Sequence, residues 1–124
     1  MNRTRTLAAL LSLALLAPAF ADEADQKSIA DIYKEKAELA GKQVKLQGKV
    51  VKVNNKIMNR NFLHLQDGSG DPALGTNDLT ITSDDTAAMG DTVSVTGTLT
   101  VDLDFGSGYK YPLLLEKASI TKAQ

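Results

Sequence analysis

The sequence predicts an all-β protein, a five-stranded Greek-key barrel preceded by one amphipathic helix. Apolar residues recur at every second position in several segments after residue 43, and clusters of Gly, Asp and Ser separate these segments. A helical spacing of apolar residues occurs once, before the first of them. Five strands, the first bent by a bulge, suit a small closed barrel, and closure removes the sheet edges that a domain without cysteine would otherwise expose.

Residues 1–21 have the parts of a secretory signal peptide. Arg3 and Arg5 precede an apolar run at 7–16, and Ala19 and Ala21 form a small-x-small cleavage site. An apolar run of about ten residues is too short for a transmembrane helix, which needs about twenty, and no later run is longer. We therefore expect export to the periplasm and a mature chain that begins near residue 22.

Residues 22–42 are expected to form a lead-in and a single helix. Ser28 and Asp31 are spaced as in a capping box, and apolar residues then follow at helical spacing. Gly41 is a typical residue for the position just after a helix. These signals place the helix at 28–40.

Residues 43–124 are expected to form the barrel. The first strand alternates from Val44 onward, and the pair Val50-Val51 breaks the alternation as a β-bulge would. The second strand, at 62–66, should turn Leu63 and Leu65 inward and its other residues outward. The remaining strands are expected at 78–83, 92–102 and 113–121, with connecting segments at 54–60, 67–70, 84–91 and 104–110; the third connection has room for a helical turn.

Two segments resemble the first and second strands of OB-fold domains of the nucleic-acid-binding, tRNA-anticodon type. They are VKLQGKV at 44–50 and FLHLQDGSG at 62–70, and the resemblance extends over about residues 43–121. The chain also resembles small stand-alone exported OB-fold proteins. The resemblance implies a ligand surface on the outer face of strands 2 and 3, flanked by the strand 1–2 and strand 4–5 loops. It selects no ligand, because OB barrels bind oligonucleotides, sugars, metals and proteins.

Composition excludes several functions. The absence of cysteine excludes thiol catalysis, thiolate metal sites and haem attachment through C-x-x-C-H. One histidine without a partner motif does not specify a nucleophilic triad, so we expect a binding module and not an enzyme. Residues 1–21 contain two of the 14 basic residues, so the mature chain has 12 against 15 acidic ones and a formal charge of −3. That charge, together with export, disfavours nucleic acid as the main partner.

Aromatic residues give the strongest indication of a binding site. Four of the five that follow residue 21 lie on the outer face of the second strand or near the strand 4–5 loop, and they are Phe62, Phe105, Tyr109 and Tyr111. Exposed rings at these places would supply stacking or apolar contact area for a ligand. The alternative is that they pack the loop onto the barrel. Polar residues that complete the candidate binding surface are Lys52, Arg60, His64 and Gln66.

Three ligand classes remain open from the sequence. The first is a small ligand, a metal or a periplasmic protein partner, recognised through this weakly polar surface. The second is a single-stranded oligonucleotide, with the rings stacking on bases while Lys49, Lys52 and Arg60 contact phosphates. The third is Cu(I), which accepts thioether and imidazole ligands and could be carried by Met58 and His64. Apart from that ion, no cofactor is expected.

Overall fold

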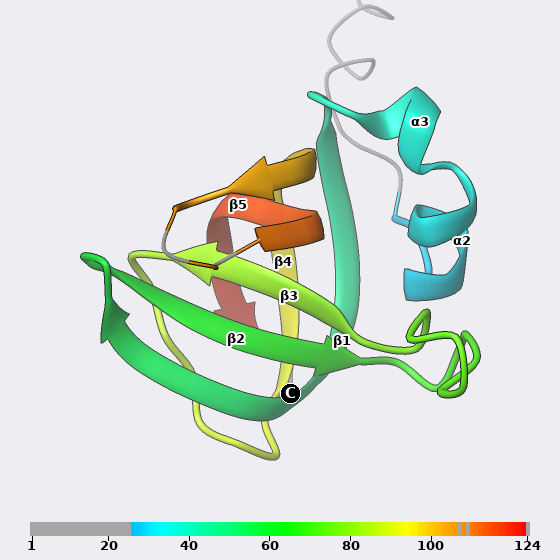
Figure 1. Ribbon diagram of the computed structural model, residues 1–124. Helices are drawn as coiled ribbons and strands as arrows, with labels where there is room; N and C mark the ends of the chain where they lie inside the picture. Colours follow the sequence, from blue (N-terminus) through cyan, green and yellow to red (C-terminus); the bar gives the residue numbers. More distant parts are fainter. Residues whose placement is uncertain (1–25, 107, 109, 124) are drawn as a thin grey trace, which may run out of the picture.

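The computed structural model describes residues 26–106, 108 and 110–123, and in it the strands close into a barrel (Figure 1). The order around the barrel is β1-β2-β3-β5-β4, and all neighbours are antiparallel except β3 and β5, which run parallel. The mainly β, OB-like barrel predicted from the sequence is confirmed. The strands are β1 (Gln43–Ile57), β2 (Arg60–Gln66), β3 (Leu79–Ser83), β4 (Thr92–Asp104) and β5 (Lys110–Lys122).

The long strand β1 bends so that it pairs with two neighbours. Its first half pairs with β4 and its second half with β2. The register with β2 moves from Val50 opposite Leu65 to Lys52 opposite His64, so Val51 is the extra residue of a bulge. The predicted bulge is confirmed, and it bends β1 enough to help close the barrel.

The segment at 54–60, expected as a polar loop, is instead part of a long β-hairpin. β1 continues to Ile57 and β2 begins at Arg60, so only Met58 and Asn59 form the turn. Both have positive φ, 52° and 63°, which is the arrangement of the type I′ turn that suits the twist of a hairpin. The prediction was wrong because Met is not a typical residue of such a turn, and the many polar side chains resembled a loop.

The single helix expected at 28–40 is two short helices, α2 (Ile29–Lys34) and α3 (Lys36–Leu39). Ser28 caps α2 as predicted, since its Oγ accepts a hydrogen bond from the Asp31 N–H at 3.1 Å. The break lies at Glu35, whose φ of −102° and ψ of 15° are not helical. The Glu35 carboxylate is held 2.9 Å from the Lys27 ammonium, a contact that an uninterrupted sequence pattern does not reveal.

The core fills the barrel and extends to α2. Leu63 and Leu65 point inward and are fully buried, as predicted, and Ile29 and Ile32 of α2 are buried in the same cluster. Figure 1 shows α2 next to the turn that follows β2. Burial of a side chain of this size contributes about 1.5–3 kcal/mol, so the helix is an integral part of the domain.

The remaining predictions concern the N-terminal segment and the connections between the strands. The predicted signal peptide at 1–21 lies outside the described residues. No helical turn forms at 84–91. Strands β4 and β5 reach further toward one another than predicted, which leaves a shorter loop between Asp104 and Lys110. Among the residues that the structure describes, no helix is long and apolar enough to cross a membrane.

Candidate functional site

The strand register places the predicted binding residues of β2 on the outer face of the barrel. Lys52 of β1 lies opposite His64, which lies opposite Thr80 of β3. Phe62 is one pair further along the same face, opposite Thr82. Side chains that are directly opposite in neighbouring strands share a face and contact one another. Lys52, Phe62 and His64 therefore belong to one continuous outer surface.

Three of the predicted aromatic residues meet on this surface. The ring centroids of Phe62 and Phe105 are 6.0 Å apart, those of Phe62 and Tyr111 are 5.8 Å apart, and those of Phe105 and Tyr111 are 5.9 Å apart. Two of these pairs are edge-to-face, an arrangement favoured by the ring quadrupole. The two ends of the β4–β5 loop thus lie against β2 (Figure 1). The fourth ring, Tyr109, lies outside the described residues.

The cluster combines packing with exposure. Phe62 is only 4% exposed and Leu114 is fully buried, yet neither belongs to the core cluster inside the barrel. Phe62 is therefore buried on the outer side of the barrel, by the Phe105 and Tyr111 rings that contact it. Phe105 and Tyr111 are half-buried, so each keeps part of its ring accessible. The rings fasten the loop to the barrel, and Phe105 and Tyr111 still present part of their surface; that this surface binds a ligand stays a prediction.

Arg60 extends the aromatic surface with a fixed positive charge. Its guanidinium lies over the Phe105 ring, 5.1 Å from the centroid, in a cation–π contact. Its Nη1 is 3.5 Å from Oε2 of Glu116, whose other oxygen accepts a hydrogen bond from Thr100 at 2.9 Å. Such a partly exposed ion pair contributes about 0–1 kcal/mol, so its main effect is to hold Arg60 in place. We call Arg60, Phe62, Phe105 and Tyr111 the aromatic edge.

A polar network occupies the other end of the β2 outer face. Nδ1 of His64 lies 2.8 Å from Oδ1 of Asp78, and Nε2 of Gln66 donates to Oδ2 of Asp78 at 3.0 Å. The Tyr33 hydroxyl donates to the Asp78 carbonyl oxygen at 2.5 Å. Burial raises the pKa of Tyr33 above its usual value, and the negative charge of Asp78 adds to the rise, so the phenol stays a donor. Asp78 and Tyr33 were not among the residues predicted for this surface. Asp78 reaches His64 because β3, which begins at Leu79, pairs with β2, and Tyr33 reaches Asp78 from α2.

The structure does not bring Met58 and His64 together. Met58 is at the tip of the β1–β2 hairpin and is 39% exposed. His64 lies four residues beyond Arg60 along β2, about 13 Å at about 3.3 Å per residue, and its Nδ1 faces Asp78. In the described part of the chain, no group of three or more His, Cys, Asp or Glu side chains could hold a metal ion. The Cu(I) hypothesis stays a prediction without geometric support.

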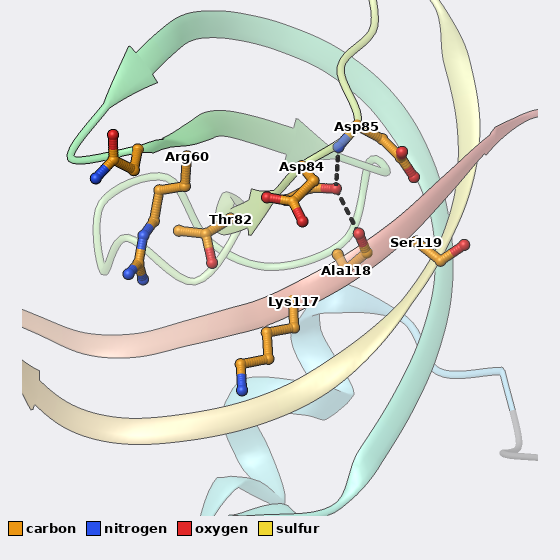
Figure 2. Close-up of a pocket in the computed structure, with 9 residues that line it drawn as sticks. Arg60, Thr82, Asp84, Asp85, Lys117, Ala118 and Ser119 are labelled. Atoms are coloured by element: carbon orange, nitrogen blue, oxygen red, sulfur yellow. Dashed lines mark hydrogen bonds between the residues drawn. The ribbon is translucent and has the colours of Figure 1, made fainter.

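A cavity of about 450 Å³ lies beside Arg60, between the hairpin tip, the end of β3 and β5 (Figure 2). It was not predicted, because its walls come from segments up to 60 positions apart that meet where β3 and β5 separate. Its lining residues are Asn59, Arg60, Thr82, Ser83, Asp84, Asp85, Lys117, Ala118 and Ser119.

Comparison with known proteins supports the fold and leaves the ligand open. No family model matches the sequence, and no curated protein matches it. Among solved structures, the chain is similar to an aspartyl-tRNA synthetase from Leishmania major Friedlin, with a TM-score of 0.53 and 15% identity over 91% of this chain. The chain spans only 26% of the length of that protein. At this identity the likeness shows a shared fold, and it is consistent with the OB-like barrel described above.

Proposed function

We propose that this protein is a non-enzymatic binding module that acts after export to the periplasm. Its ligand, a small molecule or a protein partner, is held on the outer face of β2 and β3, against the aromatic edge. The observation that carries this proposal is the contact of Phe105 and Tyr111 with buried Phe62, which joins the β4–β5 loop to the strand 2 surface. The export part of the proposal rests on the sequence of residues 1–21.

The aromatic edge has the properties of a preorganised contact surface. Aromatic rings and arginine are the side chains most enriched where proteins bind partners tightly. Here the rings of Phe105 and Tyr111 are fixed by each other and by Phe62, and the guanidinium of Arg60 is fixed by Phe105 and Glu116. Because these side chains are already ordered, they lose little further conformational entropy when a ligand binds.

Photo-cross-linking from a single site tests the proposal. A photoreactive phenylalanine derivative replaces Tyr111 in one variant of the full chain and Leu74 in a control variant, and both are expressed in exporting cells. Leu74 is 75% exposed and lies in the β2–β3 connection, so it reports random encounters. We expect an adduct of defined mass from position 111 and none from position 74. Equal yields from the two positions would contradict the proposal.

A single-stranded oligonucleotide is the second candidate ligand. Two observations favour it. The strand register places Lys49 opposite Gln66 and Lys52 opposite His64, so both lysines belong to the binding face, and the fold is similar to that of an aspartyl-tRNA synthetase. An oligonucleotide is the second candidate because residues 22–124 have a formal charge of −3, which disfavours binding to a polyanion. The adduct from position 111 distinguishes the two candidate ligands. Nuclease treatment shortens a nucleic-acid adduct and leaves a protein adduct unchanged.

A further inference from the structure

The cavity beside Arg60 contains a buried hydroxyl group without a partner. Thr82 is 2% exposed, and its hydroxyl makes no hydrogen bond to any of the residues that the structure describes. Buried polar groups nearly always have a hydrogen-bond partner, from the protein or from ordered water. Since Thr82 lines the cavity, its hydroxyl is available to a water molecule or to a ligand that displaces the water.

Two charged residues that line the cavity, both exposed to solvent, also have no partner among the described residues. Neither the Lys117 ammonium nor the Asp84 carboxylate forms an ion pair or a side-chain hydrogen bond with the described part of the chain. The two do not pair with each other, although both line the same cavity. Figure 2 shows Thr82 lying between Arg60 on one side and Lys117 and Asp84 on the other. The cavity therefore offers one cation, one anion and one hydroxyl to a ligand.

The backbone at Lys117 supports a functional role for its side chain. Its φ is 52°, in the left-handed region where a glycine would be less strained. The strain arises at a bulge, because Thr98 pairs with Glu116 and Thr96 pairs with Ser119, so Lys117 and Ala118 together oppose the single residue Gly97. Residues in such sparsely populated conformations cluster at binding and active sites, so the position of Lys117 is consistent with a role in binding.

Three other polar residues of the cavity are already engaged. Asp85 Oδ2 accepts a hydrogen bond from the Ile120 N–H at 3.1 Å. Ser83 Oγ donates to the Ala118 carbonyl oxygen and accepts from the Asp85 N–H at 2.8 Å (Figure 2). Arg60 is held by Phe105 and Glu116. These contacts build part of the cavity wall. The groups that remain to contact a ligand are Thr82, Asp84 and Lys117, together with the neutral side chains of Asn59 and Ser119, so Asp84 and Lys117 supply the unpaired charges.

We propose that this cavity binds a compact zwitterion that carries a primary ammonium group and a carboxylate, as a free amino acid or a short peptide does. The ligand ammonium lies near Asp84, and its carboxylate lies near Lys117 and accepts a hydrogen bond from Thr82. A simple anion would be repelled by Asp84, and a simple cation would be repelled by Lys117. The cavity volume of about 450 Å³ is within the range of small-molecule sites.

Two-dimensional NMR titrations of the isotope-labelled protein test this proposal with glycine, triglycine, acetate and methylammonium as probes. We expect glycine or triglycine to shift the resonances of Thr82, Asp84 and Lys117 with an affinity about tenfold higher than that of either single-charge probe. If glycine binds more tightly than triglycine, the ligand is a free amino acid, and the reverse order of affinity indicates a peptide. Equal affinity for acetate or for methylammonium overturns the proposal, as does an absence of shifts with every probe.

Matched variants show whether the unpartnered charges are responsible. Lys117→Gln and Asp84→Asn are each expected to reduce the zwitterion affinity to that of the single-charge probes. Lys34→Gln is the control, because it removes an exposed lysine of α2 that does not line the cavity. If Lys117→Gln binds as tightly as Lys34→Gln, the proposal is wrong. Neither Lys117 nor Asp84 belongs to the aromatic edge. Loss of zwitterion binding in these variants therefore says nothing about ligand binding at the aromatic edge, and each proposal can be contradicted without the other.

Discussion

Asp67 connects the turn after β2 to the start of α2. Its Oδ2 accepts the Ile29 N–H at 2.9 Å, and its Oδ1 accepts the N–H and the hydroxyl of Ser69 at 3.0 and 2.6 Å. Ser69 Oγ in turn accepts the Ala30 N–H at 2.9 Å. Burial alone would raise the pKa of Asp67, but the hydrogen bonds from Ser69 and Ile29 outweigh it and lower the pKa below its usual value. The carboxylate thus serves as a helix cap supplied by a distant part of the chain.

Replacing Asp67 is therefore expected to destabilise the protein. Asp67→Ala removes the cap and should lower the free energy of unfolding by about 1 kcal/mol near neutral pH. A carboxyl whose folded pKa is lowered stabilises the fold above its unfolded pKa, 3.8, and loses this effect as the pH falls through the folded value. Urea unfolding of both proteins at several pH values should show the gap closing in acid. A gap that stays constant with pH would contradict this account.

Lys117 gives a second test at the scale of one residue. Because its φ of 52° strains any residue with a side chain, Lys117→Gly should raise the free energy of unfolding by about 0.5 kcal/mol. Lys117→Ala keeps the strain and is the matched control, so it should leave stability unchanged. Thermal unfolding of the three proteins measures both effects. A Lys117→Gly variant that is less stable than Lys117→Ala would show that the conformation is not strained.

At the scale of elements, alternation of apolar residues predicted the inner faces of the strands well. Leu63, Leu65, Leu79 and Ile81 are all fully buried, because side chains in a strand alternate between faces regardless of the tertiary contacts. Features that depend on contacts between elements could not be predicted in this way. The Asp67 cap is an example, since the Ile29 N–H that it accepts lies 38 positions away and only the folded chain brings the two together.

The bulge where β4 meets β5 makes a prediction about Gly97. A Cβ at this position would lie 2.8 Å from the Glu116 carbonyl oxygen and 3.1 Å from the Ala118 Cα, and neither backbone group can move easily. Gly97→Ala should therefore destabilise the protein by about 1–3 kcal/mol. Gly48→Ala, where the nearest atom would be 3.2 Å away, should cost less. Urea unfolding measures both variants, and the reverse order would contradict the packing described for the bulge.

At the scale of the whole molecule, the sequence predicted the aromatic edge in outline. The outer face of β2 and the β4–β5 loop were expected to adjoin, and Phe62, Phe105 and Tyr111 do meet there. The cavity with Thr82 and Lys117 was not predicted. It depends on the parallel contact between β3 and β5, two strands that are distant in the sequence and whose pairing no alternation pattern specifies.

The character of the aromatic edge also predicts how binding responds to salt. The contact surface of Phe105 and Tyr111 is apolar, and Arg60 is already paired with Glu116. Cross-linking at position 111 should therefore change little between low and moderate salt. An oligonucleotide ligand would behave differently, because displaced counterions lower its affinity with a slope of about −0.7 per phosphate contacted in a plot of log K against log salt. A steep fall in cross-linking yield would favour the second candidate.

The most direct test of the central claim is the cross-linking yield from position 111 compared with that from position 74. The account predicts an adduct of defined mass at position 111 only, because the aromatic edge holds the ligand while Leu74 merely faces solvent. It further predicts that Phe105→Ala lowers the yield from position 111, since Phe105 supports the Tyr111 ring at 5.9 Å. Equal yields at the two positions, or a yield unaffected by Phe105→Ala, would show that the ligand binds elsewhere.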